Sequence, residues 1–296
     1  MKKAKGSIVL IIASLIWGFT FVAQSDGMNY LGPYTFNAVR FGLGFLVLLP
    51  FAIYSLYKER DRKDFKPYLK TTILAGLLCG VPEALGSTFQ QLGVSGSGAS
   101  KAGFITALYI VFVAIFGKKK QSGRIYVSIL IAVVGFYLLC INGEFRLSWS
   151  DFYLLLCAFA YCFQILCIDK YANDVNVLTF NMMQFFVTDI VSIVLMLLKE
   201  TPDMASIMAC KIPILYSGIL SCGVAYTLQI VGQKDLDPTL ASLLMSLESV
   251  FAAVGGAIVL HEKLTSKELF GCALIFVAVI LSQLPEKLLK KPLFKG

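Results

Sequence analysis

Hydrophobic residues divide the chain into ten apolar stretches, separated by short segments that carry most of its charges. Most stretches have the length that an α-helix needs to cross roughly 30 Å of hydrocarbon. A bilayer offers no hydrogen bonds to the backbone, and the stretches lack the strict alternation of β-barrel strands. We therefore predict an all-α integral membrane protein with ten transmembrane helices. These helices are expected at residues 7–24, 34–57, 69–91, 99–117, 124–141, 151–169, 177–198, 211–233, 238–260 and 267–285.

The composition agrees with a membrane location. Hydrophobic residues make up 57% of the 296 residues and charged residues 15%, whereas charged residues contribute about 25% in soluble domains. So much apolar surface cannot be hidden in one aqueous core, and a lipid bilayer is the expected environment. The net charge of +8 comes from basic residues grouped in short blocks between the apolar stretches. Such blocks are typical of cytoplasmic loops rather than of a nucleic-acid-binding face, so no nucleic acid partner is expected.

Lysine and arginine are distributed unequally between the two predicted sides of the membrane. With the N-terminus inside, 19 of the 26 basic residues fall in inside segments, 6 fall outside, and Arg40 lies within a span. The positive-inside rule then places both termini in the cytoplasm of a multi-pass protein of the cell membrane, meaning the plasma or inner membrane. The lysines before the first stretch would also suit a signal peptide. No small-residue cleavage site follows Ala23, so we predict that the first helix is retained.

Two segments that lie 144 positions apart are nearly the same. Thr35–Phe41 reads Thr-Phe-Asn-Ala-Val-Arg-Phe, and Thr179–Phe185 reads Thr-Phe-Asn-Met-Met-Gln-Phe. We predict two related halves, 1–146 and 147–296, with five helices each. An odd number of helices starts the second half on the opposite side of the membrane, so the halves are inverted relative to each other. Inverted repeats that meet at a site near the midplane are typical of alternating-access carriers.

Arg40, Glu83 and Glu248 are ionisable residues inside predicted helices, where burying a charge costs at least about 2.5 kcal/mol. Arg40 either anchors a substrate carboxylate or phosphate, which a guanidinium binds through two hydrogen bonds, or links helices or reaches the outer headgroups. Glu83 follows Pro82 and either carries a coupling proton or pairs with Arg40. Glu248 has no basic residue nearby in the sequence, which favours recognition of a proton or cation. Helix packing through a protonated carboxyl is the alternative for Glu248.

Neutral polar and aromatic residues inside the predicted helices are further candidates for a substrate cavity. Aromatic residues in membrane helices more often pack against neighbours or lie at the interface, so only some of them are expected to line a cavity. Two pairs occupy equivalent positions in the halves, Trp17 with Tyr161 and Arg40 with Gln184. The neutral candidates are Trp17, Gln90, Tyr109, Tyr161, Gln164, Gln184 and Tyr226.

The sequence contains no signal for a metal, a cofactor or catalysis. The eight cysteines form no Cys-x-x-Cys motif and His261 is the one histidine, so neither a zinc site nor a disulfide framework is indicated. Gly117-Lys118 lacks the upstream glycine and the following serine or threonine of a phosphate-binding loop. No nucleophile elbow or dinucleotide-binding glycine motif is present. We expect no metal, no cofactor, no ATP-driven motor and no enzymatic activity.

Four segments of the sequence resemble the EamA branch of the drug/metabolite transporter superfamily: Ala13–Phe21, Arg40–Phe41, Ala241–Phe251 and Leu260–Thr265. The resemblance covers essentially the whole chain. It implies two inverted five-helix repeats around a central cavity, lined mainly by helices 1, 3, 4, 6, 8 and 9. It also implies export or exchange of small metabolites, often amino acids, without ATP hydrolysis. The family commonly has proline where this chain has Ile110 and Ser249, so we expect softer breaks in the fourth and ninth helices.

We predict the substrate site from the polar and aromatic residues named above that lie on the helices implied to line the cavity. We predict a gating or structural role for Arg40 and Gln184, whose helices begin at opposite membrane faces. The predicted function is a secondary-active or facilitative transporter, an exporter or exchanger of small metabolites such as amino acids. It would work by alternating access as a monomer or homodimer, with protons as the candidate coupling ion. The predicted cavity residues are Trp17, Glu83, Gln90, Tyr109, Tyr161, Gln164, Tyr226 and Glu248.

Three other functions compete with this prediction. A flippase for a lipid-linked carrier would need a lateral opening and basic residues that bind a headgroup. An intramembrane enzyme would need catalytic residues clustered at one membrane depth, whereas the polar residues here are scattered along the spans. A channel would conduct faster than a carrier turns over.

Overall fold

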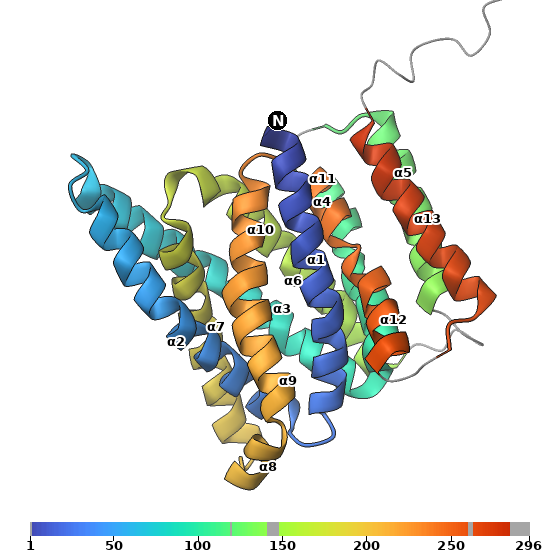
Figure 1. The fold of residues 1–296 in the computed structure, drawn as a ribbon, viewed down its shortest axis with the longest axis horizontal. Coiled ribbons are helices and arrows are strands. Elements are labelled where there is room, and N and C mark those ends of the chain that lie inside the picture. Colours follow the sequence, from blue (N-terminus) through green and yellow to red (C-terminus); the bar gives the residue numbers. More distant parts are fainter. Residues whose placement is uncertain (1, 119, 141–147, 260–262, 285–296) are drawn as a thin grey trace, which may run out of the picture.

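The structure, a computed structural model, describes residues 2–118, 120–140, 148–259 and 263–284, and no strand occurs in these ranges (Figure 1). The first half contains α1 (Lys2–Gly27), α2 (Pro33–Glu59), α3 (Phe65–Ala107), α4 (Tyr109–Phe116) and α5 (Gly123–Cys140). The second half begins with α6 (Trp149–Tyr171), a 3-10 turn (Ala172–Asp174), α7 (Val177–Lys199), α8 (Met204–Ala209) and α9 (Lys211–Leu215). It continues through a π-helical segment (Tyr216–Ala225), α10 (Tyr226–Gln233), α11 (Pro238–Met245), α12 (Glu248–Val259) and α13 (Ser266–Gln283).

Within the described ranges, 8 helices are long and apolar enough to cross a membrane. Two shorter apolar helices, Lys101–Phe116 and Gly123–Leu139, correspond to the predicted fourth and fifth spans. Large apolar side chains point outward, among them Leu46, which is 61% exposed, and Leu197, which is 68% exposed, as expected for contact with lipid tails. The predicted all-α membrane fold is therefore confirmed, and the count of ten helices is approximate because two of them are short.

The link between the third and fourth predicted spans is helical. α3 continues from Phe65 to Ala107, so residues 92–98, which the apolar pattern assigns to a loop, belong to the helix. Ser97 Oγ and Lys101 Nζ lie 2.8 and 2.7 Å from the carboxylate of Asp151, near the start of α6. This ion pair fixes the end of the third span against the second half of the chain.

The threonine of the repeated Thr-Phe-Asn sequence fixes the start of α2 and of α7. The backbone N–H and the hydroxyl of Thr35 donate to the carboxylate of Glu200, at 2.7 and 2.6 Å, so the end of α7 caps the start of α2. At the start of α7, Asn176 Oδ1 accepts from the backbone N–H and the hydroxyl of Thr179, at 3.1 and 3.0 Å. Asn176 also donates to Ser55, near the end of α2, at 2.7 Å. The two copies therefore join α2 to α7 at both ends of this antiparallel pair.

The asparagine of each copy binds a neighbouring helix. Asn37 Nδ2 donates to the carbonyl of Ser87 in α3 at 3.0 Å, and Asn181 Nδ2 donates to the carbonyl of Cys222 in the π-helical segment at 3.4 Å. The phenylalanine before each asparagine is fully buried. The Thr-Phe-Asn part of each copy thus positions α2 and α7, and its residues do not line the central cavity.

The fourth and ninth spans are both interrupted, at equivalent positions in the two halves. Leu108 separates α3 from α4, and Ser246 and Leu247 separate α11 from α12. A backbone hydrogen bond between residues three apart marks each interruption. The N–H of Leu108 donates to the carbonyl of Ile105, and the N–H of Leu247 donates to the carbonyl of Leu244, both at 3.2 Å. Both helices are therefore interrupted, over one residue in the first half and two in the second, which is compatible with the expected softer breaks. These helices break without proline because tighter 3-10 turns replace α-helical hydrogen bonds at these positions.

Ser249, which stands where the family commonly has proline, connects the two interrupted helices. Its hydroxyl donates to the carbonyl of Gly103 in α3 at 2.9 Å, and both groups are buried. We expect Ser249→Ala to fold and to lose about 0.6 kcal/mol of stability, the average for such bonds between membrane helices. Denaturant titration in detergent micelles measures this loss. Ser95→Ala is the matched control, because the exposed Ser95 hydroxyl bonds only within α3, and an equal loss in both variants would contradict the expectation.

The two halves pack against each other along most of their length. α2 lies against α7, α3 against α6 and α7, and α1 against α10 and α12 (Figure 1). α5 and α13 form a pair at one side of the molecule, where a Cβ on Gly135 or Gly271 would lie 2.8 or 2.6 Å from the other glycine's carbonyl oxygen. Small residues allow such close approach between membrane helices. Because nearly every major contact joins one inverted repeat to the other, the space at the centre is shared by both.

Candidate functional site

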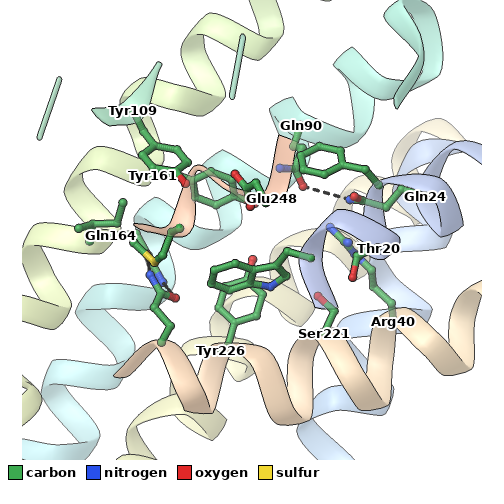
Figure 2. Close-up of a pocket in the computed structure, with 15 residues that line it drawn as sticks. Thr20, Gln24, Arg40, Gln90, Tyr109, Tyr161, Gln164, Ser221, Tyr226 and Glu248 are labelled. Carbon is green, nitrogen blue, oxygen red and sulfur yellow. Dashed lines mark hydrogen bonds between the residues drawn. The ribbon is translucent and has the colours of Figure 1, made fainter. Parts of the chain in front are cut away.

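A cavity of about 50 Å³ lies between the two repeats (Figure 2). This volume holds roughly four water molecules at about 10–15 Å³ each. Nearly all of the lining side chains are buried, so the cavity lies in the interior of the helix bundle. The lining residues are Trp17, Thr20, Phe21 and Gln24 of α1, Arg40 of α2, Gln90 of α3, Tyr109 of α4, Tyr161, Gln164 and Ile165 of α6, Ser221 of the π-helical segment, Tyr226 and Gln229 of α10, Met245 of α11 and Glu248 of α12.

The structure brings most of the predicted cavity residues together in this wall. Glu83 is the exception, since it is fully buried beside the cavity and is not part of the lining. Gln184 also lies behind the wall, where it contacts the lining residue Gln164. The predicted residues found in the wall are Trp17, Gln90, Tyr109, Tyr161, Gln164, Tyr226 and Glu248.

Arg40 occupies a different place from the one that the sequence analysis favoured. The resemblance does not include the second helix in the cavity lining, so Arg40 was assigned a gating or structural role. In the structure Arg40 is 3% exposed and lines the cavity. The first turns of α2 lean against the π-helical segment, where a Cβ on Gly218 would lie 3.0 Å from the Arg40 carbonyl oxygen. This packing directs the start of α2 toward the centre of the molecule.

Several polar residues of the wall are not among the predicted candidates, namely Thr20, Gln24, Ser221 and Gln229. Two features of the sequence point to three of these residues. Thr20 is the repeat partner of the predicted residue Gln164, at the same offset of 144. Gln24 and Gln229 are polar residues within apolar stretches, which is the criterion that selected Gln90. Ser221 carries no such signal, because serine is common in membrane helices as a packing residue.

The two helix interruptions place one side chain each at the cavity. Tyr109 is the first residue of α4 and Glu248 is the first residue of α12. The first N–H groups of a helix lack intrahelical partners and carry partial positive charge, which stabilises a carboxylate there. The Tyr109 side chain interacts electrostatically with Glu248, and both residues are buried. Each half thus contributes one interrupted helix, with its N-terminal side chain in the cavity wall.

Aromatic rings form the middle of the wall. Trp17 and Tyr226 meet edge to face, with their centroids 5.0 Å apart, and Phe185 packs behind Tyr226 at 5.2 Å. The Trp17 Nε1 and the Tyr161 hydroxyl are buried and have no hydrogen-bond partner among the described residues. These groups are available to a polar ligand, while the ring faces offer apolar contact.

One end of the cavity is cationic. The Arg40 guanidinium packs on the Phe41 ring, 4.6 Å from its centroid, and faces the side-chain amide of Gln24 (Figure 2). With the Gln24 amide oxygen toward the guanidinium, it accepts from Arg40 Nη1 at 2.8 Å and from Nη2 at 3.2 Å. In the opposite orientation of the Gln24 amide, Nε2 occupies this position and donates to Gln90 Oε1 and to Gln91 Oε1, both at 3.0 Å. Arg40 forms no ion pair of 4 Å or less within the described part of the chain.

The opposite end, where Gln164 lies in Figure 2, is neutral and is formed by carboxamides. Gln164 Nε2 donates to Gln184 Oε1 and to Gln229 Oε1, both at 3.3 Å, and Gln229 Nε2 donates to Gln164 Oε1 at 3.0 Å. The Cys79 thiol donates to Gln184 Oε1 at 3.0 Å. Gln184 and Arg40 occupy matching positions in the two repeats. The two ends of the cavity are therefore built from equivalent parts of the repeats and differ in charge.

Glu83 is a second buried carboxyl near the cationic end. Neither of its oxygens has a hydrogen-bond partner in the described ranges, although the Tyr226 side chain and the Arg40 guanidinium are close enough to act on its charge. The direct pairing of Glu83 with Arg40, one of the two possibilities raised by the sequence, is not formed as a close ion pair in this conformation. The guanidinium remains accessible from the cavity.

The described residues contain no group of three or more His, Cys, Asp and Glu side chains that could hold a metal ion. The cysteines that the structure describes are all free thiols. His261, the one histidine, lies outside the described residues, as do Leu260 and Glu262 of the segment that resembles the EamA branch.

Comparison with known proteins gives a consistent result. The model of the EamA-like transporter family matches the chain twice, at residues 4–141 and 148–284. An uncharacterized transporter of Archaeoglobus fulgidus is 31% identical over 96% of this chain and 87% of its own length. The uncharacterized transporter YoaV of Bacillus subtilis is 20% identical over 92% of this chain and 94% of its own. A solved crystal structure covers 97% of this chain and 99% of its own with a TM-score of 0.77, and at 16% identity it shows the fold alone.

Proposed function

Because this chain belongs to the EamA-like transporter family, we propose that it is a secondary-active or facilitative carrier of small metabolites such as amino acids. It exports or exchanges its substrate by alternating access and without ATP hydrolysis. Membership of the family and similarity to named transporters make the chain a membrane transporter. The substrate class, the coupling and the mechanism are the proposed part.

The observation that carries this proposal is the cavity at the interface of the two repeats, whose wall combines aromatic rings with buried polar side chains from both halves. Its volume of about 50 Å³ is far below the roughly 300–1,000 Å³ of ligand pockets, so in this conformation the cavity is too small for most metabolites. A carrier that works by alternating access changes the shape of its site during the cycle, because the site must close on one side before it opens on the other. A channel, in contrast, needs a continuous path.

Further parts of the proposal follow from the same architecture. The repeats correspond to residues 1–146 and 147–296, and they rock about the shared cavity. Both termini lie in the cytoplasm, and the protein resides in the plasma or inner membrane as a monomer or homodimer. Glu248 is the candidate proton-binding group, because it is buried at the start of a broken helix and faces the cavity.

Transport by the purified protein tests the proposal directly. We expect proteoliposomes loaded with a mixture of unlabelled metabolites to take up an external radiolabelled substrate by counterflow, in the absence of ATP. Empty liposomes and a variant with Trp17 and Tyr226 both changed to alanine, which removes the aromatic middle of the wall, are the controls. An uptake that requires ATP, or one that proceeds as ion conductance in planar bilayers, would contradict a carrier.

A further inference from the structure

Two cysteine thiols from different repeats meet behind the neutral end of the cavity. Cys79 of α3 is fully buried, and its Sγ lies 3.7 Å from the carbonyl oxygen of Gln164 in α6. Cys167 follows Gln164 by three residues, which is close to one turn of a helix. The two thiols lie within hydrogen-bonding range of each other, and Cys167 packs against the apolar cluster that contains Cys79. Their sulfur atoms are therefore in contact across the interface of the two repeats.

The other cysteine side chains that the structure describes have different neighbours. Cys157 lies 3.8 Å from the hydroxyl of Thr106, and Cys210 donates to the carbonyl of Gly27 at 3.9 Å. Cys162, in the same helix as Cys167, is fully buried and makes no hydrogen bond to another thiol. Among these described side chains, the contact between two thiols is thus confined to Cys79 and Cys167.

One thiol of this pair can be reached from outside the protein and the other cannot. Cys167 is partly exposed and lies four residues before Tyr171, the last residue of α6. The exposed ammonium of Lys170 acts electrostatically on Cys167, so this thiol lies near the polar surface of the membrane. The proposed topology places this end of α6 in the cytoplasm. An accessible cysteine beside a buried partner is the arrangement of thiols that are oxidised reversibly, because the second thiol resolves the first product.

We propose that Cys79 and Cys167 form an oxidation site, at which a small disulfide from the cytoplasm converts the two thiols into a disulfide bond between the repeats. Disulfides in a reducing compartment are usually transient and regulatory rather than structural. The structure holds the pair as free thiols, as expected for the reduced form. The site adds a covalent modification to the chain and does not depend on which substrate the carrier moves.

The reaction is a thiol–disulfide exchange in two steps. The Cys167 sulfur gives up its proton and attacks one sulfur of the small disulfide, whose S–S bond breaks to release a first thiolate. The Cys79 sulfur then gives up its proton and attacks the mixed disulfide at Cys167 Sγ, which releases a second thiolate. Each thiolate takes up one of the two protons. Two protein thiols are thereby oxidised to one disulfide, and the small disulfide is reduced to two thiols.

The disulfide would act on transport in two ways, and this consequence rests on the proposed function. α3 and α6 are already joined at their other ends, where Lys101 Nζ lies 2.7 Å from Asp151. A covalent bond at Cys79 adds a second joint, so the first repeat can no longer move against the second along this pair of helices. Oxidation also removes the proton that Cys79 donates to Gln184 Oε1 at 3.0 Å. We therefore expect the oxidised carrier to stop transporting.

The site itself is tested by mass spectrometry of the full chain in lipid nanodiscs. We would expose the reduced protein to hydroxyethyl disulfide, a small uncharged oxidant, block the remaining thiols and digest the protein. We expect a joined peptide that contains Cys79 and Cys167, about 2 Da lighter than its two reduced parts together because two hydrogens are lost, and its disappearance with dithiothreitol. Cys167→Ser should abolish the joined peptide. Cys162→Ala, the matched control in the same helix, should retain it.

Counterflow in proteoliposomes tests the consequence for transport. We expect hydroxyethyl disulfide to abolish counterflow by the unmodified protein and by Cys162→Ala, and dithiothreitol to restore it. The Cys167→Ser variant should transport before and after the oxidant, because it cannot form the bond between the repeats. A general inactivation of the protein by the oxidant would appear in this variant too.

Several outcomes would overturn the proposal. A mixed disulfide that persists at Cys167, blocking of both cysteines as free thiols after the oxidant, or a joined peptide that pairs Cys167 with another cysteine would remove the site. A mapped disulfide between Cys79 and Cys167 with unchanged counterflow would remove its effect on transport. If the reduced protein showed no counterflow at all, the proposed function would fall and the effect on transport with it, while the mapped disulfide would still establish the site.

Discussion

The Glu248→Gln variant is expected to transport at a rate that no longer depends on pH. Glutamine has almost the same shape as glutamate and cannot ionise, so it removes the proton and leaves the wall intact. In the unmodified protein we expect rates to change with pH by up to about tenfold per unit, because each unit changes the free energy of one bound proton by about 1.4 kcal/mol. Counterflow measured between about pH 5 and pH 8, where folded proteins are usually most stable, gives the comparison.

The surroundings of Glu248 explain why it is the group to test. Tyr109 of α4 and Cys157 of α6 interact with it electrostatically, and no lysine, arginine or histidine of the described residues forms an ion pair with it. A carboxyl in such a place exchanges its proton only when the cavity opens to one side. Glu248→Asp, which keeps the carboxyl, should retain the pH dependence. If Glu248→Gln keeps the full pH profile and Glu83→Gln loses it, the proton site is Glu83 instead.

The second large effect is expected at Gly18, where α1 crosses α12. A Cβ at this position would lie 2.7 Å from the Phe251 carbonyl carbon and 2.8 Å from the Ala252 nitrogen, both of which are backbone atoms that cannot rotate away. Gly18→Leu must therefore push the two helices apart, and overpacking of this kind usually costs about 1–3 kcal/mol or more. The separation would also part Trp17 from Glu248 across the cavity.

Thermal unfolding in detergent and counterflow in liposomes measure the consequences of Gly18→Leu. We expect a clearly lower melting temperature and the loss of transport. Gly123→Leu is the matched control, because a Cβ at Gly123 has no atom within 4 Å, and this variant should keep both properties. A Gly18→Leu protein that is as stable and active as the control would show that α1 and α12 do not need this close contact.

The helices and their environment could be predicted from the sequence because each depends on local properties. A stretch of apolar residues long enough to span a bilayer must satisfy its own backbone hydrogen bonds, which leaves the helix as its structure. The link after Gln91 shows the limit of this argument. It lies between two predicted spans, yet α3 continues through it, and the contacts of Ser97 and Lys101 with Asp151 hold it against α6.

The candidate site could be predicted only in part. A polar residue inside an apolar stretch is costly in lipid, so the sequence correctly indicates that Tyr161, Gln164 and Glu248 face protein or a cavity. It does not indicate which of these residues share a space. That depends on the rotation of each helix about its axis and on how closely two helices approach. Arg40 lines the cavity because α2 leans on the π-helical segment, whereas its repeat partner Gln184 lies behind the wall.

The sequence by itself determined that this protein is a helical membrane protein of two related, inverted halves. The length of the apolar stretches, the odd number of spans in each half and the internal repeat can all be recognised along the chain, without knowledge of how the helices pack. The tertiary structure alone decided where the spans break and what meets at the centre. The interruptions at Leu108 and Leu247 arise without proline, from tight turns held by the surrounding helices. The cationic and neutral ends of the cavity arise from residues far apart in the chain, which only the packing of α2 against α7 and of α1 against α12 brings together.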